Sequence, residues 1–261
     1  MGALGISKEV LGLPQFLVAP EEFVQTGDLI VSGQEARHMA GSRRLRPGDR
    51  VRLADGSGRV AVAQIEAIEK AGVRLSVVQD LGARDDLIAC TIYLSLIRLE
   101  RFEFALSKLF EIGVAAVQPI VTTRSLSGGV RPERVLKRLP RWERMALEAL
   151  KQSRGFRATE VRPPVPLGEA VLQEGFAFKL ALLEERRGSG FLQVLEGEQA
   201  PFPCCVAIGP EGGFDPSEKE VLLGSGFQGV GLGNRILRSE TAAIYAAAAV
   251  AEVYLKKGQN P

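Results

Sequence analysis

Histidine and cysteine are scarce: the 261 residues include one histidine, His38, and three cysteines, Cys90, Cys204 and Cys205. A structural zinc site needs about four such ligands, and a Ser-His-Asp triad would have to use His38. We therefore expect neither a metal nor a triad. An odd number of cysteines, two of them adjacent, also argues against a disulfide framework and favours a reducing compartment. The chemistry must then come from backbone groups, arginine, carboxylate or a cofactor.

Long apolar runs are lacking too. The longest, from Ala242 to Ala251, is too short to span a bilayer. The first twenty residues contain no sustained apolar core of the kind that a signal peptide has. We therefore expect a cytoplasmic protein with no membrane partner. The formal net charge of +2 is too small to identify a partner, so the placement of the charges matters more.

The first third of the chain alternates between apolar and polar residues, which is typical of β-strands. Two such runs, at 51–53 and 60–65, flank the turn sequence Asp55-Gly56-Ser57-Gly58, so they predict a hairpin. A further alternating run covers 73–78. Short strands joined by turns indicate a small β-barrel over residues 1–86, and the polar stretch 82–86 marks its end.

The pattern then changes to strands alternating with helices, which indicates a parallel α/β sheet over residues 87–261. We predict a helix at 101–112 that ends at Gly113, and a helical region at 132–154 interrupted at Pro140. The last helix covers 239–257. The predicted strands are 91–97, 117–121, 178–183, 204–208 and 228–232. Because ligands bind beyond the carboxyl ends of such strands, the loops after Leu183, Ile208 and Leu232 are the candidate site.

The loop after Ile208 reads Gly209-Pro210-Glu211-Gly212-Gly213. Its glycines allow backbone to approach a ligand closely, although a tight turn without a ligand fits them equally well. Asp215 is a suitable N-cap for the next helix, with Pro216 at its first position and Glu218 completing a capping box.

The loop after Leu232 places Ile236 and Leu237 between charged residues. We expect these two side chains to pack on protein or on the apolar face of a ligand. A buried loop in which Arg238 pairs with Glu240 is the alternative. The nearby run Gly224–Gly229 matches a dinucleotide fingerprint, but a helix precedes it and a strand follows, which is the wrong order for that motif.

Basic residues gather in two stretches, 37–52 and 131–157. The first has six arginines and one acid. In the second, basic residues recur at helical spacing on one face: Arg134, Arg138, Arg141, Arg144 and Lys151. A single charged stretch is usually a solvated face, but two of them in different domains favour a polyanionic partner.

These features belong to motifs distributed over nearly the whole chain. They include Leu45-Arg46-Pro47-Gly48-Asp49-Arg50-Val51, Lys108 to Val114, Ile208 to Phe214 and Leu232 to Ala243. In these motifs the chain resembles the SPOUT-class small-subunit ribosomal RNA uracil-N3 methyltransferases of the RsmE type. It departs from their pattern at two positions. Gln15 stands where they have an arginine, and Arg154-Gly155 stands where they have Gly-Arg.

The resemblance implies a PUA-like N-terminal barrel that binds RNA, followed by an α/β methyltransferase domain with a C-terminal trefoil knot. It further implies S-adenosyl-L-methionine as cofactor and a homodimer formed through the knot region. The implied cofactor site is Leu183, Glu184, Gly209, Pro210, Glu211, Gly212, Gly213, Leu232, Gly233, Asn234, Arg235, Ile236, Leu237 and Arg238. The residues expected to bind RNA are Arg37, His38, Arg43, Arg44, Arg46, Arg124 and Arg141.

The implied reaction is methylation of N3 of a uridine in small-subunit (16S) ribosomal RNA. We expect Arg238 and Glu240 to be the catalytic residues, with Glu240 or Glu211 orienting the arginine or taking the N3 proton. Two alternatives stay open. One is a non-catalytic ribosome-assembly factor of the same fold, and the other is a methyltransferase of the same fold with another RNA target.

Overall fold

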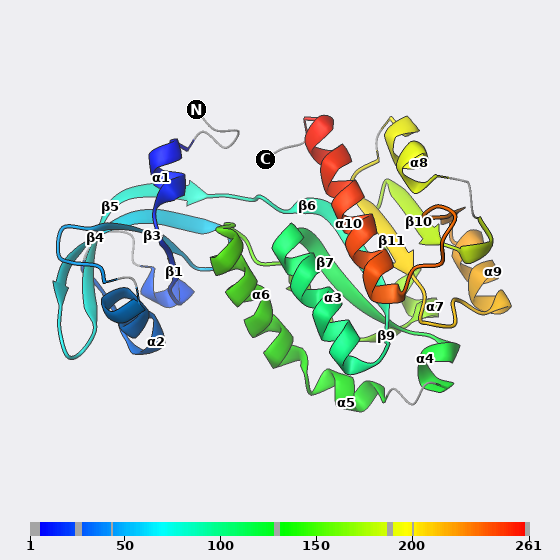
Figure 1. Cartoon of the computed structure of the whole chain (residues 1–261), viewed down its shortest axis with the longest axis horizontal. Helices are drawn as coiled ribbons and strands as arrows, with labels where there is room; N and C mark the ends of the chain where they lie inside the picture. The colour runs from blue at the N-terminus through cyan, green and yellow to red at the C-terminus, as the bar shows by residue number, and fades with distance from the viewer. Residues whose placement is uncertain are drawn as a thin grey trace. The chain divides into compact units, whose positions relative to one another are not determined.

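The computed structural model describes residues 6–23, 28–42, 44–127, 131–186, 190–199 and 201–258. These residues fall into two units (Figure 1). One combines the described part of Met1–Asp86 with Leu147–Ala158, and the other contains Leu87–Ala146 and the described part of Thr159–Gln259. The sequence division at residue 86 therefore assigned Leu147–Ala158 to the other part of the chain. This segment joins the first unit because its Phe156 is buried in a cluster with Ile6 and Val60.

The first unit contains a five-stranded sheet in the order β1-β3-β4-β5-β2. Its strands are β1 (Gln15–Leu17), β2 (Asp28–Val31), β3 (Arg50–Ala54), β4 (Arg59–Ile68) and β5 (Val73–Ala83). The predicted hairpin is confirmed as the antiparallel pair β3 and β4. Three register shifts between β4 and β5 bend this part of the sheet, as β-bulges do. The unit also contains the short elements α1 (Lys8–Gly12), η1 (Pro20–Glu22), α2 (Gly33–Arg37) and η2 (His38–Ser42).

The second unit is built on a parallel sheet, as the alternation of strands and helices predicted. Its strands are β6 (Ile88–Ser95), β7 (Val114–Val121), β8 (Glu160–Val161), β9 (Val165–Pro166), β10 (Phe178–Leu182), β11 (Cys204–Ile208) and β12 (Gln228–Val230). The order is β12-β10-β11-β6-β7-β8, with β9 also paired to β7, and every pair is parallel. β10, β11 and β12 therefore end at one edge of the sheet, where the three candidate loops begin.

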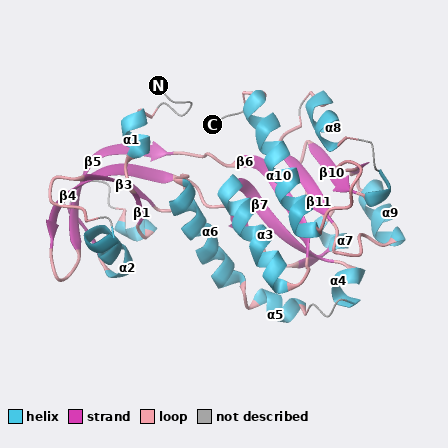
Figure 2. Ribbon diagram, in the orientation of Figure 1, coloured by secondary structure: helices cyan, strands magenta, loops and turns pink. Residues whose placement is uncertain are grey.

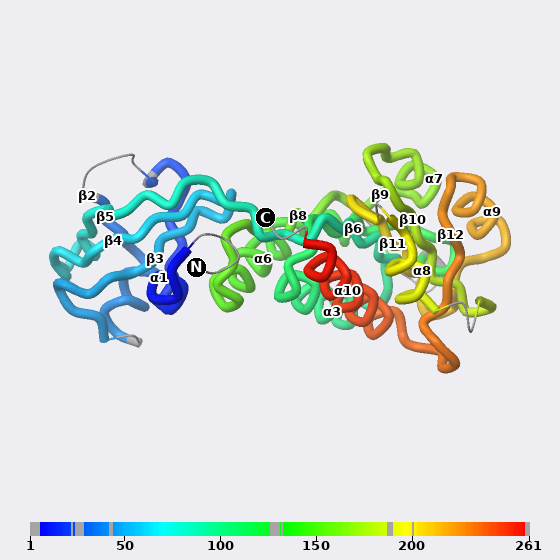
Figure 3. The backbone as a smooth tube through the Cα atoms, turned by 90° about the horizontal axis from the view of Figure 1, so that it is seen from above, coloured from blue at the N-terminus to red at the C-terminus, as the bar shows by residue number. Residues whose placement is uncertain are grey.

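Helices cover both faces of this sheet (Figures 2 and 3). On one face lie α3 (Leu99–Ile112), α8 (Phe191–Gly197) and α10 (Ser239–Lys256), and on the other lie α7 (Leu167–Ala170) and α9 (Pro216–Gly224). α10 packs closely because Ala243, Ala246 and Ala247 on its inner face are fully buried. Within the described ranges, no helix is both long enough and apolar enough to cross a membrane.

The predicted helical region at 132–154 consists of α5 (Pro132–Leu136) and α6 (Leu139–Ser153). The break falls at Lys137 and Arg138, and not at Pro140 as predicted. Pro140 lies in the first turn of α6, where a proline needs no backbone N–H partner and its fixed φ suits the helix.

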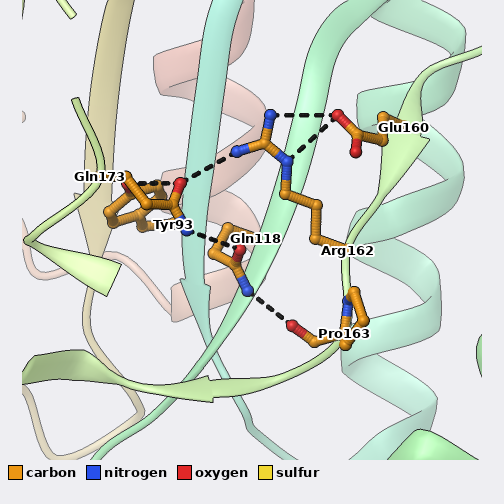
Figure 4. Close-up of polar contacts among 6 residues, drawn as sticks. All are labelled: Tyr93, Gln118, Glu160, Arg162, Pro163 and Gln173. Atoms are coloured by element: carbon orange, nitrogen blue, oxygen red, sulfur yellow. Dashed lines mark hydrogen bonds and ion pairs between the residues drawn. The ribbon is translucent and has the colours of Figure 1, made fainter. Parts of the chain in front are cut away.

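A partly buried polar network, in which Tyr93 and Gln118 are buried, joins the β8 end of the sheet to the segment that follows α7 (Figure 4). The Gln173 amide accepts from Arg162 Nη1 at 2.9 Å and donates to Gln118 Oε1 at 3.0 Å. Gln118 Nε2 donates in turn to the Pro163 carbonyl at 2.7 Å, and the Tyr93 hydroxyl lies 3.0 Å from Gln173 Oε1. Burial raises the pKa of Tyr93 well above its ordinary value. The network satisfies these buried groups internally, so it is a structural element.

The chain between β12 and α10 makes a long crossing. β12 lies at the edge of the sheet beside β10, whereas α10 packs on β6, β11 and α3 near its middle. Residues 231–238 must therefore pass across the carboxyl ends of the intervening strands. This path is the one on which the resemblance places a trefoil knot, and the threading itself stays a prediction.

The end of α3 gives a direct test of the predicted helix stop. Gly113 has φ +82° and its N–H donates to the Leu109 carbonyl, a left-handed cap that a side chain makes unfavourable by about 1–2 kcal/mol. We expect Gly113→Ala to lower the midpoint of thermal unfolding by about 3–6 °C. Gly168→Ala, in α7 and with open space around its Cα, is the control and should not lower it. An unchanged midpoint for Gly113→Ala would contradict this role for the cap.

Candidate functional site

A cavity opens at the carboxyl ends of β10, β11 and β12. Its empty space, together with the open solvent at its mouth, is about 820 Å³. All three loops selected from the sequence contribute to its wall. The predicted cofactor residues on the wall are Leu183, Glu184, Gly209, Pro210, Glu211, Gly212, Gly213, Leu232, Gly233, Arg235, Ile236 and Leu237. Asn234 and Arg238 do not line it.

The glycines of the loop after β11 serve the loop as well as the cavity. Gly213 has φ +71° and donates its N–H to the Pro210 carbonyl at 2.8 Å. A Cβ on Gly209 would lie 3.1 Å from the Phe214 nitrogen. This contact is tighter than usual, and the backbone around Phe214 would have to shift to relieve it. The loop thus needs glycine to close its own turn, and the same lack of side chains leaves its backbone open to the cavity.

Two residues of α4 (Thr123–Ser127) brace this loop. Arg124 donates from Nη1 to the Gly212 carbonyl, and the Thr123 N–H donates to Glu218 Oε1 at 2.7 Å. Glu218 also completes the predicted capping box with Asp215, which is confirmed. The N–H of Glu218 donates to the Asp215 carboxylate, and this bond, with further donors, lowers the Asp215 pKa to about 2. The start of α9 is therefore fixed on both sides of the glycines.

The loop after β12 presents apolar side chains at the cavity. Ile236 is 60% exposed and Leu237 is half-buried, so the structure does not bury Ile236 against protein. Of the two sequence interpretations, packing on a bound ligand is the one that this exposure favours. Ser239 at the start of α10 donates from Oγ to the Gly209 carbonyl at 2.8 Å, which ties the two glycine-containing loops together.

The two residues expected to be catalytic lie beside the cavity and not on its wall. Arg238 is exposed at the N-cap of α10. Glu240 is buried in the first turn of that helix, and its Oε1 lies 4.0 Å from Arg101 Nε on α3. Arg101 also donates to Glu211. Sequence reasoning missed Arg101, because an arginine near the start of a helix carries no distinctive signal.

The residues expected to bind RNA divide between the two units. In the first unit Arg37, Arg44 and Arg46 are exposed and His38 is half-buried, with its ring 5.5 Å from that of Phe16. Arg43 lies outside the described residues. Arg52, the last arginine of the same basic stretch, is fully buried. Burial lowers its pKa to about 10, and it cannot be part of an exposed basic surface.

In the second unit Arg124 lies on the cavity wall. Arg141 donates from Nε and Nη2 to the two oxygens of the Glu103 carboxylate, each at 3.2 Å. The predicted single basic face is also wrong. Arg134 lies in α5, Arg138 lies in the break, and the other three residues lie in α6. Glu103 pairs with Arg138 and Arg141, and Glu35 pairs with Lys151 at 2.6 Å in the first unit. These acids come from distant parts of the sequence, so the helical spacing could not reveal them.

The two departures from the family pattern meet in one buried cluster. Gln15 donates from Nε2 to the Gly155 carbonyl at 2.8 Å and accepts from Arg52 Nε at 2.8 Å. Arg52 Nη2 donates to the carbonyl of Arg154 at 2.9 Å, and Arg154 has φ +60°. The changes at 15 and at 154–155 are therefore linked by contact.

Among the residues that the structure describes, no group of three or more histidine, cysteine, aspartate or glutamate side chains is arranged to hold a metal ion. The cysteines are buried free thiols. The groups that the described cavity wall offers are backbone, apolar side chains and the Ser239 hydroxyl, with the carboxylates of Glu184, Glu185 and Glu211 and the cations of Arg124, Lys219 and Arg235.

Two domain families and several named proteins are similar to this chain. The RNA methyltransferase domain family matches residues 84–251, and the RNA methyltransferase PUA domain family matches residues 31–78. Proteins named ribosomal RNA small subunit methyltransferase E are similar over most of the chain. The Synechocystis protein is 30% identical, covering 90% of this chain and 76% of its own length. The Mycobacterium bovis protein is 32% identical, covering 85% of each.

Solved structures of methyltransferases are also similar to this chain over most of its length. The ribosomal RNA small subunit methyltransferase E of Neisseria gonorrhoeae, bound to S-adenosyl methionine, is 28% identical with a TM-score of 0.78, covering 92% of this chain and 98% of its own. A probable rRNA-methyltransferase from Porphyromonas gingivalis is 31% identical with a TM-score of 0.77, covering 94% and 100%. With a PUA-type unit before a parallel-sheet unit and a family match over well more than half its length, the chain belongs to the RNA methyltransferase family that these small-subunit ribosomal RNA enzymes represent.

Proposed function

We propose that this chain methylates N3 of a uridine in 16S ribosomal RNA, with S-adenosyl-L-methionine as the methyl donor. The observation that carries the proposal is the cavity at the carboxyl ends of β10, β11 and β12, whose wall contains twelve of the fourteen residues implied for the donor site. The similarity to small-subunit ribosomal RNA methyltransferases over most of the chain supports the choice of RNA.

The wall fits a donor that is part polar and part apolar. Backbone of Gly209–Gly213 and of Leu232–Leu237 would hold its polar groups, and Glu184 offers an acceptor for hydroxyl or amino groups. Exposed Ile236 offers apolar surface that no protein group covers fully. When bound, S-adenosylmethionine supplies a methyl group on a positively charged sulfur.

The chain's own part in the reaction is positioning and charge stabilisation. N3 lies on the pairing edge of uracil, so the base must be unpaired or flipped out to reach the cavity. Loss of the N3 proton builds negative charge on the flanking carbonyl oxygens. We propose that Arg238, exposed at the N-cap of α10, stabilises that charge. We propose that Glu240 supports Arg101 and Arg238 through its negative charge. Arg37, His38, Arg43, Arg44 and Arg46, with Arg124 and Arg141, would contact RNA.

The donor site is tested by calorimetric titration with S-adenosylmethionine. We expect Ile236→Ala to raise the dissociation constant about tenfold, equivalent to roughly 1.4 kcal/mol, because the side chain would lose its apolar contact with the donor. Thermal stability should hardly change, since Ile236 is 60% exposed. Leu172→Ala, an exposed apolar residue away from the cavity, is the control. Failure of the unsubstituted protein to bind the donor would favour the non-catalytic alternative.

The reaction is tested by nucleoside mass spectrometry of 16S ribosomal RNA that lacks the modification, after incubation with the protein and donor. We expect 3-methyluridine in a single-turnover reaction. Arg238→Ala should slow it by about 10²–10³-fold, the usual effect of removing one donor to developing charge. Lys256→Ala, a cation at the other end of α10, should react normally. A methyl group on another nucleotide would establish the alternative target, and an unchanged rate for Arg238→Ala would remove its role.

We further propose that the chain is a homodimer through the knot region, with α10 as part of the interface. Tyr245 and Leu255 on α10 are 47% and 54% exposed, and paired burial of such residues supports a stable interface. Light scattering should give about twice the 28.1 kDa of one chain, and Tyr245→Asp should lower the measured mass toward that of one chain. A mass of one chain for the unsubstituted protein at micromolar concentration would overturn this proposal.

A further inference from the structure

The starts of α3 and α10 and the loop after β11 meet beside the cavity through one arginine. Arg101, in the first turn of α3, donates from Nη1 to Glu211 Oε1, and its Nε lies 4.0 Å from Glu240 Oε1. The two helices lie side by side on the same face of the sheet (Figure 1). One guanidinium therefore lies between two carboxylates, one from each of two chain segments far from α3 in the sequence.

The two carboxylates have different surroundings. The Glu211 side chain is 44% exposed and forms part of the cavity wall. The Glu240 side chain is 10% exposed, it is off that wall, and its Oε2 is buried with no hydrogen-bond partner among the described residues. A buried carboxylate without a cation is strongly unfavourable, so Glu240 depends on Arg101, whereas Glu211 can also face a ligand.

Ser239, the residue before Glu240, fixes the start of α10 to the loop after β11. Ser239 donates to the Gly209 carbonyl, so the first turn of α10 is fixed to the same loop that carries Glu211. Arg101 completes a second tie between α10 and this loop by way of α3. The loop is also held by Arg124 at Gly212, which leaves the Glu211 side chain as the part of the loop whose position Arg101 decides.

We propose that Arg101 is a positioning residue for methyl transfer: it fixes the Glu211 carboxylate at the cavity, and the buried Glu240 carboxylate holds it from behind. This inference rests on the proposed function and assigns the carboxylates separate tasks. Glu211 accepts the proton from N3 of uracil, and the electron pair left on N3 forms the bond to the methyl carbon while the bond from that carbon to the donor sulfur breaks and its electron pair stays on the sulfur. Glu240 pairs with Arg101 once Glu211 has taken the proton. Its unpartnered Oε2 can then accept a hydrogen bond from the guanidinium.

The test is single-turnover methylation at saturating donor and RNA, with the donor dissociation constant and thermal midpoint measured for each variant. We expect Arg101→Ala to lower the rate constant at least tenfold while changing the donor dissociation constant less than threefold. Arg101→Lys should recover part of the rate, because one ammonium group can pair with either carboxylate but does not hold both in a fixed geometry. Lys108→Ala, which removes an exposed cation from the same helix, should match the unsubstituted protein.

Glu211→Gln and Glu240→Gln keep the shapes of the two side chains. They test the proposed roles of the carboxylates even if Arg101→Ala is unfolded. Each should slow the reaction at least tenfold, and Arg101→Lys with Glu240→Gln should be no slower than the slower single variant, since coupled residues are not additive. Normal rates for Arg101→Ala or Glu211→Gln would overturn the proposal, as would a defect confined to donor affinity. Absence of 3-methyluridine with the unsubstituted protein would overturn the proposed function instead.

Discussion

The position of β12 is the constraint on which the candidate site depends. Because β12 lies beside β10 at the end of the strand order and α10 packs near the middle of the sheet, the chain between them has to cross the carboxyl ends of the strands. That crossing brings a third loop to the two that already end there. The cavity follows from the order of the strands, and the side chains then determine what it can hold.

Within this frame each loop contributes something that the others lack. The loop after β11 contributes backbone, because glycine is required by its own turn. The loop after β12 contributes apolar side chains that protein leaves exposed. Salt bridges and hydrogen bonds from α3, α4 and the start of α10 hold both loops in place. A preorganised wall of this kind suits a reaction in which the protein acts by positioning and charge.

The sequence predicted periodic elements and local caps well, because these depend on neighbouring residues. The stop of α3 at Gly113 and the capping box at Asp215 are examples. It failed where distant residues decide. Arg52 has the same spacing as its exposed neighbours, but Gln15 and Arg154 enclose it. The helical region breaks before α6 and not at Pro140, because proline is accepted in the first turn of a helix. The contacts of Arg101 appear only in the folded chain, where Glu211 and Glu240 lie beside it.

The return of Leu147–Ala158 to the first unit affects how this protein can be divided. Phe156 and Leu147 pack against residues from the N-terminal segment, and Asp86 accepts hydrogen bonds from the backbone of Phe156 and Arg157. A fragment cut after residue 86 would therefore lack part of its own interior. Exchanging the first unit between related enzymes would require two grafted segments, not one. A change at Gln15 would also affect residues 154 and 155, because Arg52 and Gln15 donate hydrogen bonds to their carbonyls.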